Sequence, residues 1–414
     1  MNEMTPFERQ VEHELHAMVG PIPRFDAVEI AETAVASRPR GLRWLGLLRR
    51  PPTLDVLGLA AAVVVLVLGI GIIASLMPWD GGPVRIEGKG SYASVGSAIG
   101  AAVDGDVVLI DPGVYEGTVE VSRDITIRGD SDEPDAVLFR IPSDGPSFRL
   151  READATISGI TFLSIEPDDG SDRRQAIDVV GGTPVLEDLV ARADAPVEFD
   201  FVRLYETGEG TLVTGNISSG DIRANRGAQA LIEDNVLLSQ DDGPAVGITL
   251  ERADVTLEIR GNELNYVGVF TGQAELTGNE IHGARSDVPA AESLQADYIQ
   301  NGSCGVVALG GGRAVLTDDR IFDNGTGICG NVEIVGGEIF DNDVGYLLVT
   351  PDPEGPRDER VVSGAVIRDN AVGILAGESA AVQLIDVAFC GNGVDIEAHE
   401  TADIGRSGSA TCEP

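Results

Sequence analysis

An asparagine recurs along the C-terminal half of this 414-residue chain. Each copy has an apolar residue, one or two small or polar residues, and then the asparagine, as in the sequence IEDN. Eight gaps separate the first copy from the last, with a mean of 22 residues. The nine copies end at Asn216, Asn235, Asn262, Asn279, Asn301, Asn324, Asn342, Asn370 and Asn392. A period of this size indicates stacked structural repeats.

Each repeat predicts a strand, a tight turn and another strand. Asparagine tolerates the left-handed backbone that a sharp corner requires, and stacked asparagine amides can bond along the stack. Apolar residues alternate on both sides of the turn, as at Val362, Ile367 and Ile374, so one face of each strand points inward. No repeat buries that face alone, so the pattern predicts an all-β solenoid of about a dozen rungs ~4.8 Å apart. A β-sandwich does not predict this spacing of asparagines.

The second constraining feature is an uncharged apolar run, Val56 to Met77. At ~1.5 Å per residue its 22 residues reach about 33 Å, enough to cross a bilayer core. Five arginines precede it between residues 38 and 50, and a strongly acidic region follows, which favours a cytoplasmic N-terminus. We therefore predict a cytoplasmic tail over 1–53, a transmembrane helix over 54–79 and an extracytoplasmic domain over 80–414, in a single-pass cell-membrane protein.

The tail predicts two short helices, the first capped by Thr5-Pro6-Phe7-Glu8 and the second by Asp26. Such helices are marginal alone. Residues 1–37 therefore either bind a cytoplasmic protein partner or form a solubilising tail. The tail histidines His13 and His16 have no accompanying cysteine, which argues against zinc.

The net charge of −39 restricts the partners. It argues against nucleic acid, which requires a basic face, and against unassisted binding of anionic polysaccharides. Neutral sugars, cations and basic partners stay compatible with it. Acidity that only keeps a surface protein soluble is the plainer interpretation.

The stretch from Tyr92 to Asp130 resembles the opening of the pectin-lyase-like right-handed parallel β-helix superfamily. Ser94 is expected to cap a short helix, with Val95, Ala98 and Ile99 on one face, that closes the end of the core. The asparagine turns resemble the same superfamily, so the likeness covers residues 84 to 410. It implies the fold, but not the activity, because the superfamily includes lyases, hydrolases, esterases, epimerases and non-enzymatic binders.

The catalytic patterns of these relatives are incomplete in this sequence. The esterase motifs are missing apart from a partial match at 198–202. Gln240-Asp241-Asp242 matches the central carboxylate pair of inverting hydrolases, but the flanking motifs are absent. His282 is interpreted as a solvated turn histidine. We predict no catalytic residue.

Lyase-type elimination requires calcium held by clustered carboxylates. Acidic residues gather at Glu166, Asp168, Asp169 and Asp172, and a second cluster comprises Asp352, Glu354, Asp358 and Glu359. Oxygen ligands of this kind can hold calcium, and Asp168, Asp169 and Asp172 are the candidate ligands. The alternative is that both clusters are exposed acidic loops. No other cofactor is expected.

The four cysteines all follow the predicted membrane span, where disulfides persist. Cys390 and Cys412 lie 22 residues apart and Cys304 and Cys329 lie 25 apart, each close to one rung. Stacked neighbours are within bridging distance, so we predict these two disulfides.

These observations favour a membrane-anchored β-helix that binds a carbohydrate or another surface component without catalysis. The alternatives are a polysaccharide lyase or hydrolase acting on an extracellular glycan, and a structural spacer or signalling protein whose tail binds a cytoplasmic partner.

Overall fold

The computed structural model describes residues 82–131, 133, 135–165, 174–194, 198–239, 245–284, 304–348, 360–408, 410 and 412. Within these ranges, no helix has the length and apolar character needed to cross a membrane. The predicted tail and transmembrane helix, residues 1–79, lie outside them.

The described chain folds into three long sheets. Sheet A contains β1 (Val84–Ile86), β2 (Gly90–Tyr92), β3 (Val107–Ile110), β6 (Thr126–Gly129), β9 (Thr156–Ser158), β12 (Val185–Glu187), β15 (Leu212–Thr214), β18 (Gln229–Glu233), β21 (Thr256–Arg260), β24 (Gln273–Thr277), β27 (Arg313–Thr317), β30 (Val332–Val335), β33 (Arg360–Ser363), β36 (Ala381–Ile385) and β39 (Asp403–Ser407). Sheet B contains β4 (Gly113–Glu116), β7 (Val137–Arg140), β10 (Thr161–Ser164), β13 (Val190–Ala193), β16 (Ile217–Ser218), β19 (Val236–Leu237), β22 (Glu263–Leu264), β25 (Glu280–His282), β28 (Arg320–Phe322), β31 (Glu338–Phe340), β34 (Val366–Arg368) and β37 (Ala388–Cys390). Sheet C contains β5 (Val119–Val121), β8 (Pro146–Arg151), β11 (Arg174–Val180), β14 (Phe199–Tyr205), β17 (Asp221–Asn225), β20 (Gly247–Leu250), β23 (Tyr266–Val269), β26 (Cys304–Ala308), β29 (Thr326–Gly330), β32 (Val344–Leu348), β35 (Val372–Ala376) and β38 (Val394–Ala398).

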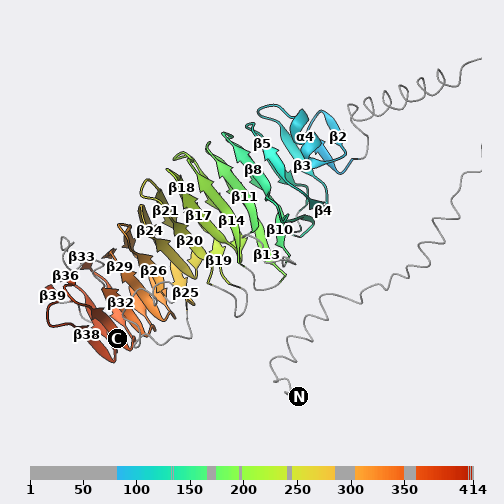
Figure 1. The fold of residues 1–414 in the computed structure, drawn as a ribbon. Coiled ribbons are helices and arrows are strands. Elements are labelled where there is room, and N and C mark those ends of the chain that lie inside the picture. The colour runs from blue at the N-terminus through green and yellow to red at the C-terminus, as the bar shows by residue number, and fades with distance from the viewer. Residues whose placement is uncertain are drawn as a thin grey trace, which may run out of the picture. The chain divides into compact units, whose positions relative to one another are not determined.

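Each rung visits the three sheets in the same order, A, then B, then C. Every strand beyond β2 pairs in parallel with the equivalent strand of the next rung, as β18 does with β21. The rungs follow one another along the solenoid in Figure 1. The fold is therefore a right-handed parallel β-helix, the fold of the pectin-lyase-like superfamily. Twelve strands in each of sheets B and C agree with the rung count that the asparagine spacing predicts.

The N-terminal end is closed by the predicted helix. Helix α4 (Val95–Ala101) starts at Ser94, whose side chain accepts a hydrogen bond from the Ser97 amide. The Ser97 side chain in turn accepts a hydrogen bond from the Ser94 backbone amide, which completes a capping box. Val95, Ala98 and Ile99 are buried and belong to the continuous core. The helix thus covers apolar side chains that the first rung would otherwise expose.

The core consists of the inward side chains of all three sheets. It forms one continuous cluster from Val84 to Leu384. Near the N-terminal end it includes Phe139, Phe148 and Phe162, whose rings lie 4.9 to 6.1 Å apart. Because alternate residues point outward, the rigid core fixes the position of every outer side chain.

The residue with left-handed backbone at each corner is the one before the asparagine. Asp234 (φ 55°), Asp341 (φ 54°) and Asp369 (φ 56°) take this conformation, and their neighbours Asn235, Asn342 and Asn370 do not. The prediction that asparagine itself supplies the left-handed corner is therefore wrong. The preceding Asp or Gly makes the turn, and this leaves the asparagine side chain directed into the corner, where its amide bonds the adjoining rungs.

The asparagines form two ladders at two different corners. Asn216, Asn235, Asn262 and Asn279 lie between sheets A and B, and each Nδ2 donates to the next side-chain oxygen, ending on Asp319. Asn324, Asn342, Asn370 and Asn392 lie between sheets B and C and bond in the same way. Asn301 lies outside the described residues. The single ladder that the mean spacing suggested is therefore two separate ladders.

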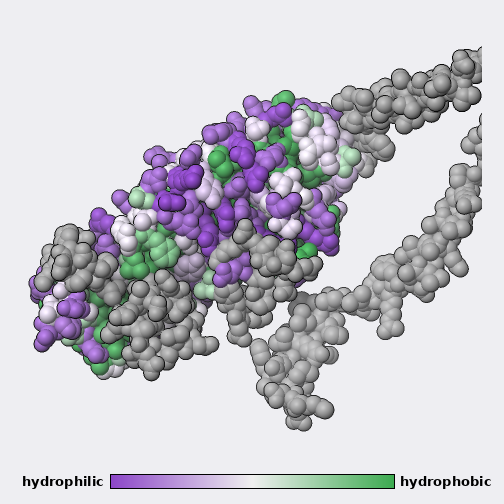
Figure 2. Space-filling model, in the orientation of Figure 1, coloured by the Kyte–Doolittle hydropathy of each residue, from purple (hydrophilic) through white to green (hydrophobic). Residues whose placement is uncertain are grey.

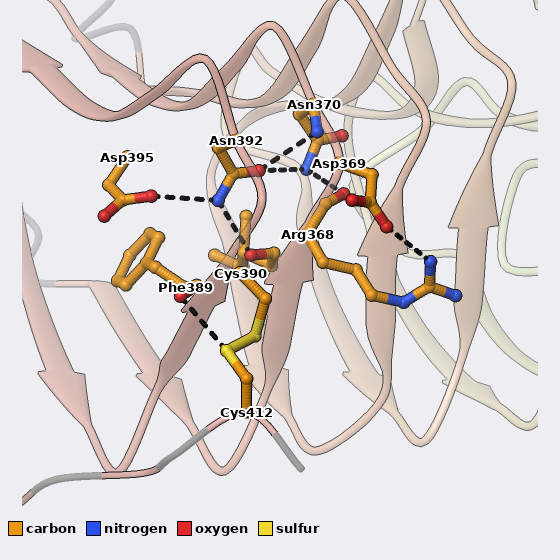
Figure 3. The surroundings of a disulfide bond; sticks show 9 residues. Arg368, Asp369, Asn370, Phe389, Cys390, Asn392, Asp395 and Cys412 are labelled. Carbon is orange, nitrogen blue, oxygen red and sulfur yellow. Dashed lines mark hydrogen bonds and ion pairs between the residues drawn. A yellow bond between two sulfur atoms is a disulfide. The ribbon is translucent and has the colours of Figure 1, made fainter. Parts of the chain in front are cut away.

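Both predicted disulfides are present. Cys304 bonds to Cys329 across neighbouring strands of sheet C, with Cα atoms 6.2 Å apart. Cys390, at the end of β37, bonds to Cys412, with Cα atoms 6.0 Å apart. Figure 3 shows the second bridge below the last two asparagines of the ladder, Asn370 and Asn392. It ties the C-terminal segment to the last strand of sheet B.

Candidate functional site

A column of polar side chains, all but one of them charged, follows the outer face of sheet C. Strand pairing aligns one residue from each successive rung, and their sequence neighbours, such as Leu150, Val179 and Leu204, are buried in the core. The column consists of Glu120, Arg149, Asp178, Arg203, Arg223 and Thr249. Figure 2 shows hydrophilic residues over the middle rungs, where Figure 1 labels β11, β14 and β17.

Asp200 is the buried anchor of this column. Its side chain is fully buried, and its two oxygens face different arginines. Arg203 Nε donates to Oδ2, and Arg223 Nε lies 2.8 Å from Oδ1. Strand β14 bulges here, because the register against β17 shifts between Asp200 and Val202. Bulges often redirect a side chain, and here the carboxylate faces both guanidinium groups.

The two terminal guanidinium nitrogens of Arg223 pair with two more carboxylates. Nη1 lies 3.0 Å from Glu251 Oε1, and Nη2 lies 3.7 Å from Asp221 Oδ2. Asp221 is itself held by the backbone amide of Gly247, 3.1 Å from Oδ1. Arg223 is therefore fixed from three directions, and little conformational entropy remains for a ligand to remove.

The ion pair with Asp200 keeps Arg203 protonated. Burial lowers the pKa of Arg203, but the charge of Asp200 and its hydrogen bond more than offset this, and the pKa is raised overall. Arg203 therefore stays a cation and cannot act as a base near neutral pH. Thr249 lies in the rung after Arg223, and its hydroxyl group shares a hydrogen bond of 2.9 Å with that of Tyr266.

The network presents hydrogen-bond donors and acceptors side by side. Four arginines (Arg149, Arg151, Arg203, Arg223) face five carboxylates (Glu120, Asp178, Asp200, Asp221, Glu251). Arg149, Arg203 and Arg223 are 20% to 28% exposed, and Arg151 is more exposed. Planar, fixed polar groups of both kinds suit a ligand rich in hydroxyl groups, because each hydroxyl donates and accepts. The described strands of sheet C contain neither histidine nor lysine.

A second surface lies at the corner between sheets B and C. An open groove of about 570 Å³ is lined by Phe322, Asp323, Asp341, Asn342, Asp343, Asp369 and Ala371. Next to it His282, Phe322 and Phe340 stack with ring centroids 4.8 and 4.9 Å apart. Arg368 covers Phe340 at 4.0 Å. The ring faces are thus occupied by one another and by arginine, so the stack offers ring edges rather than an open platform.

Most of the residues predicted to have chemical roles lie outside the described ranges. The calcium candidates Asp168, Asp169 and Asp172, the second acidic cluster and Gln240-Asp241-Asp242 lie outside the described residues. Across the described ranges, no group of three or more His, Cys, Asp or Glu side chains is arranged to hold a metal ion. His282 is the last residue of strand β25 and bonds to Glu263 at 3.0 Å, so its interpretation as a turn residue is wrong.

The sequence interpretation missed Asp200, Arg203 and Arg223 as a unit. Residues 198–202 drew attention only as a partial match to an esterase strand. The available signal was the spacing of Arg203 and Arg223, which differ by 20 residues, close to one rung. Rung lengths vary, so the pairing became certain only in the register of β14 with β17.

No protein-family model and no curated protein matches this chain. Similar solved structures include a mutant of the periplasmic alginate epimerase AlgG (12% identity, 89% of this chain and 100% of that chain covered, TM-score 0.46). Another is the catalytic unit of a GH87 alpha-1,3-glucanase from Streptomyces thermodiastaticus (14%, 77% and 66%, 0.46). A third is PfbA, a surface adhesin of Streptococcus pneumoniae (12%, 72% and 82%, 0.41). At this distance function does not transfer, and the fold assignment rests on the strand pairing of the chain itself.

Proposed function

We propose that this protein is a single-pass membrane protein whose extracytoplasmic β-helix binds a neutral glycan on the outer face of sheet C without catalysing its cleavage. The observation that carries the proposal is the Asp200 network. A fully buried carboxylate between two arginines is costly to desolvate, and this cost is repaid only where the geometry is well satisfied. Here it holds Arg203 and Arg223 in fixed positions on an outer face.

The charge balance favours a neutral ligand. Five carboxylates outnumber four arginines in the network, and the whole chain has a net charge of −39. An anionic polymer would meet repulsion both locally and at long range. The hydroxyl groups of a neutral sugar chain can accept hydrogen bonds from the arginines and donate them to the carboxylates.

The raised pKa of Arg203 argues against lyase-type elimination on this face, because elimination requires a basic residue that abstracts a proton. A general base must be able to accept a proton near the working pH. The raised pKa of Arg203 keeps it protonated, and Arg223 is bound by Asp200, Asp221 and Glu251. The remaining alternatives are a polysaccharide lyase or hydrolase, and a structural spacer whose tail binds a cytoplasmic partner through residues 1–37.

A glycan array probed with the detergent-solubilised full chain, with and without calcium, tests the binding. The expected result is retention of one or more neutral glycans, with at least ~10-fold weaker binding for Glu251→Gln, because the substitution replaces one acceptor with a donor and removes one of the three carboxylates that hold Arg223. Glu280→Gln is the matched control, since Glu280 has a similar ion pair, to Arg320, on sheet B. Equal loss in both variants, or no retained glycan, would falsify the proposal, and new reducing ends or unsaturated products would identify the enzyme alternative.

The membrane anchor has its own test. The arginines before Val56 and the acidic region after Met77 support a cytoplasmic N-terminus. A protease added outside intact cells should therefore digest sites beyond residue 80 and leave the tail protected. Protection of the β-helix instead of the tail would reverse the predicted orientation.

A further inference from the structure

Asp319 takes the place of an asparagine in the ladder between sheets A and B. It lies in the turn from β27 to β28 and is 3% exposed. Its Oδ1 accepts hydrogen bonds from the backbone amide and Nδ2 of Asn279, at 2.8 and 2.7 Å. Its Oδ2 accepts one from the backbone amide of Thr317 at 3.0 Å. The side chain is therefore enclosed, and all its described partners are N–H donors.

A carboxylate cannot continue the ladder. In the rungs before it, each asparagine receives bonds on its oxygen and donates from its nitrogen, as Asn262 does to Ile232 O, Arg260 O and Asn279 Oδ1. An ionised Asp319 has no donor. The next rung has Gly337 at the equivalent position, since the Glu338 amide donates to the backbone oxygen of Asp319. The ladder ends here on a buried charge.

The charged groups around Asp319 do not neutralise it. In its own turn, Asp318 is a like charge, and the guanidinium of Arg320 pairs with Glu280 of the preceding rung. In the following rung, Glu338 pairs with Arg368. Among the described residues, no cation bonds to the Asp319 carboxylate. Burial raises the pKa of Asp319 to about 6 from 3.8, against the lowering effect of the bonds from Asn279 and Thr317.

We propose that Asp319 is a pH-sensitive joint in the solenoid, at which the rungs from β24 to β31 stack more tightly when the carboxyl group is protonated than when it is ionised. This role is independent of glycan binding. It places a response to mild acidification in the middle of the β-helix, where the ladder between sheets A and B stops and the ladder between sheets B and C begins.

The raised pKa of Asp319 determines how the stability of the folded chain changes with pH. The carboxyl group binds a proton more tightly in the folded chain than in the unfolded chain. Its contribution to stability is therefore fully present below the unfolded pKa of 3.8 and is lost as the pH rises through about 6. Above that pH the folded chain contains the ionised, buried group.

Asp319→Asn tests the proposal, because it fixes a neutral group with a donor in the same place. Thermal unfolding and hydrogen exchange of the full chain, the latter corrected for intrinsic rates, are measured from pH 4 to 8. At pH 8 the opening constant of peptides spanning 313–340 should fall by about 100-fold relative to the unsubstituted chain. This difference should shrink through pH 6 and vanish near pH 4.

Asp318→Asn is the matched control, since it removes the same charge one residue away in the same turn. It should keep a pH dependence, with the midpoint moved slightly lower because a like charge near Asp319 is removed. A pH-independent difference for Asp319→Asn, or the same pH profile in both variants, would overturn the proposal. If Asp319→Asn does not fold, the pH dependence of hydrogen exchange in the unsubstituted chain still tests the proposal. Protection of 313–340 that does not increase from pH 8 to pH 5 would also overturn it.

Discussion

The two asparagine ladders make the same bonds at different corners of the solenoid. In the first, Asn262 Oδ1 accepts from the amide and Nδ2 of Asn235, and its Nδ2 donates to two backbone oxygens and to Asn279. In the second, Asn342 makes the same five bonds, to Asn324, Ile321, Phe340 and Asn370. The first lies between sheets A and B, the second between sheets B and C.

Because the same bonds occur at two different corners, the ladder is a property of the turn and not of one side of the fold. It requires a left-handed residue, an asparagine directly after it, and the same pair in the next rung. Asp234 provides the left-handed position at one corner and Asp341 at the other. At Asp319 the asparagine is replaced and the first ladder stops. The second ladder begins at Asn324, at the next corner of the same rung.

The largest expected effect comes from the middle of either ladder. Asn262→Val and Asn342→Val each remove five hydrogen bonds and leave buried amide and carbonyl groups without partners, so each should lower the free energy of unfolding by about 3–5 kcal/mol. Urea unfolding of both variants gives the values. A difference above ~1 kcal/mol between them would show that the corners are not energetically equivalent.

The two disulfides should differ in their resistance to reduction. Cys304 and Cys329 are at most 1% exposed, whereas Cys412 is exposed. A mild reductant applied to the folded protein should open the Cys390–Cys412 bridge first, at a cost of up to about 3 kcal/mol on the chain-entropy account. Differential alkylation and peptide mapping detect the order. Simultaneous opening of both bridges would contradict it.

The left-handed positions predict a smaller effect. Asp234→Val and Asp341→Val should each cost about 1–2 kcal/mol, because a β-branched side chain is strained at positive φ. The corresponding glycine substitutions should be nearly neutral and serve as controls. The measurement is the shift of the unfolding midpoint. Equal losses for valine and glycine would assign the effect to the aspartate side chain instead of the backbone.

The smallest effect is expected at the end of the second ladder. Asn392 accepts from Asn370, but it donates to Ile367 O and to the exposed Asp395, and water can replace part of these bonds. Asn392→Val should therefore cost about 1 kcal/mol. A loss as large as that of Asn342→Val would mean that the last rung is as strongly coupled as the middle ones.

The solenoid, its capping helix and its two disulfides could be predicted from the sequence. Each depends on local signals: the turn sequence and its period, the Ser94 cap before Val95, and cysteines about one rung apart. The number of rungs followed from the same period. Such features can be predicted because they repeat along the chain, or because they depend on residues that are close together in the sequence.

The sequence pattern does not reveal which corner each asparagine occupies or which outer side chains meet, because both depend on strand register. Within the first ladder the steps from Asn216 to Asp319 are 19, 27, 17 and 40 residues, and within the second they are 18, 28 and 22. With loops of such variable length, a mean of 22 cannot distinguish a full rung from a step between corners. The network of Asp200, Arg203 and Arg223 has the same origin, since strand register, set by core packing and a bulge, brings together residues that the sequence separates.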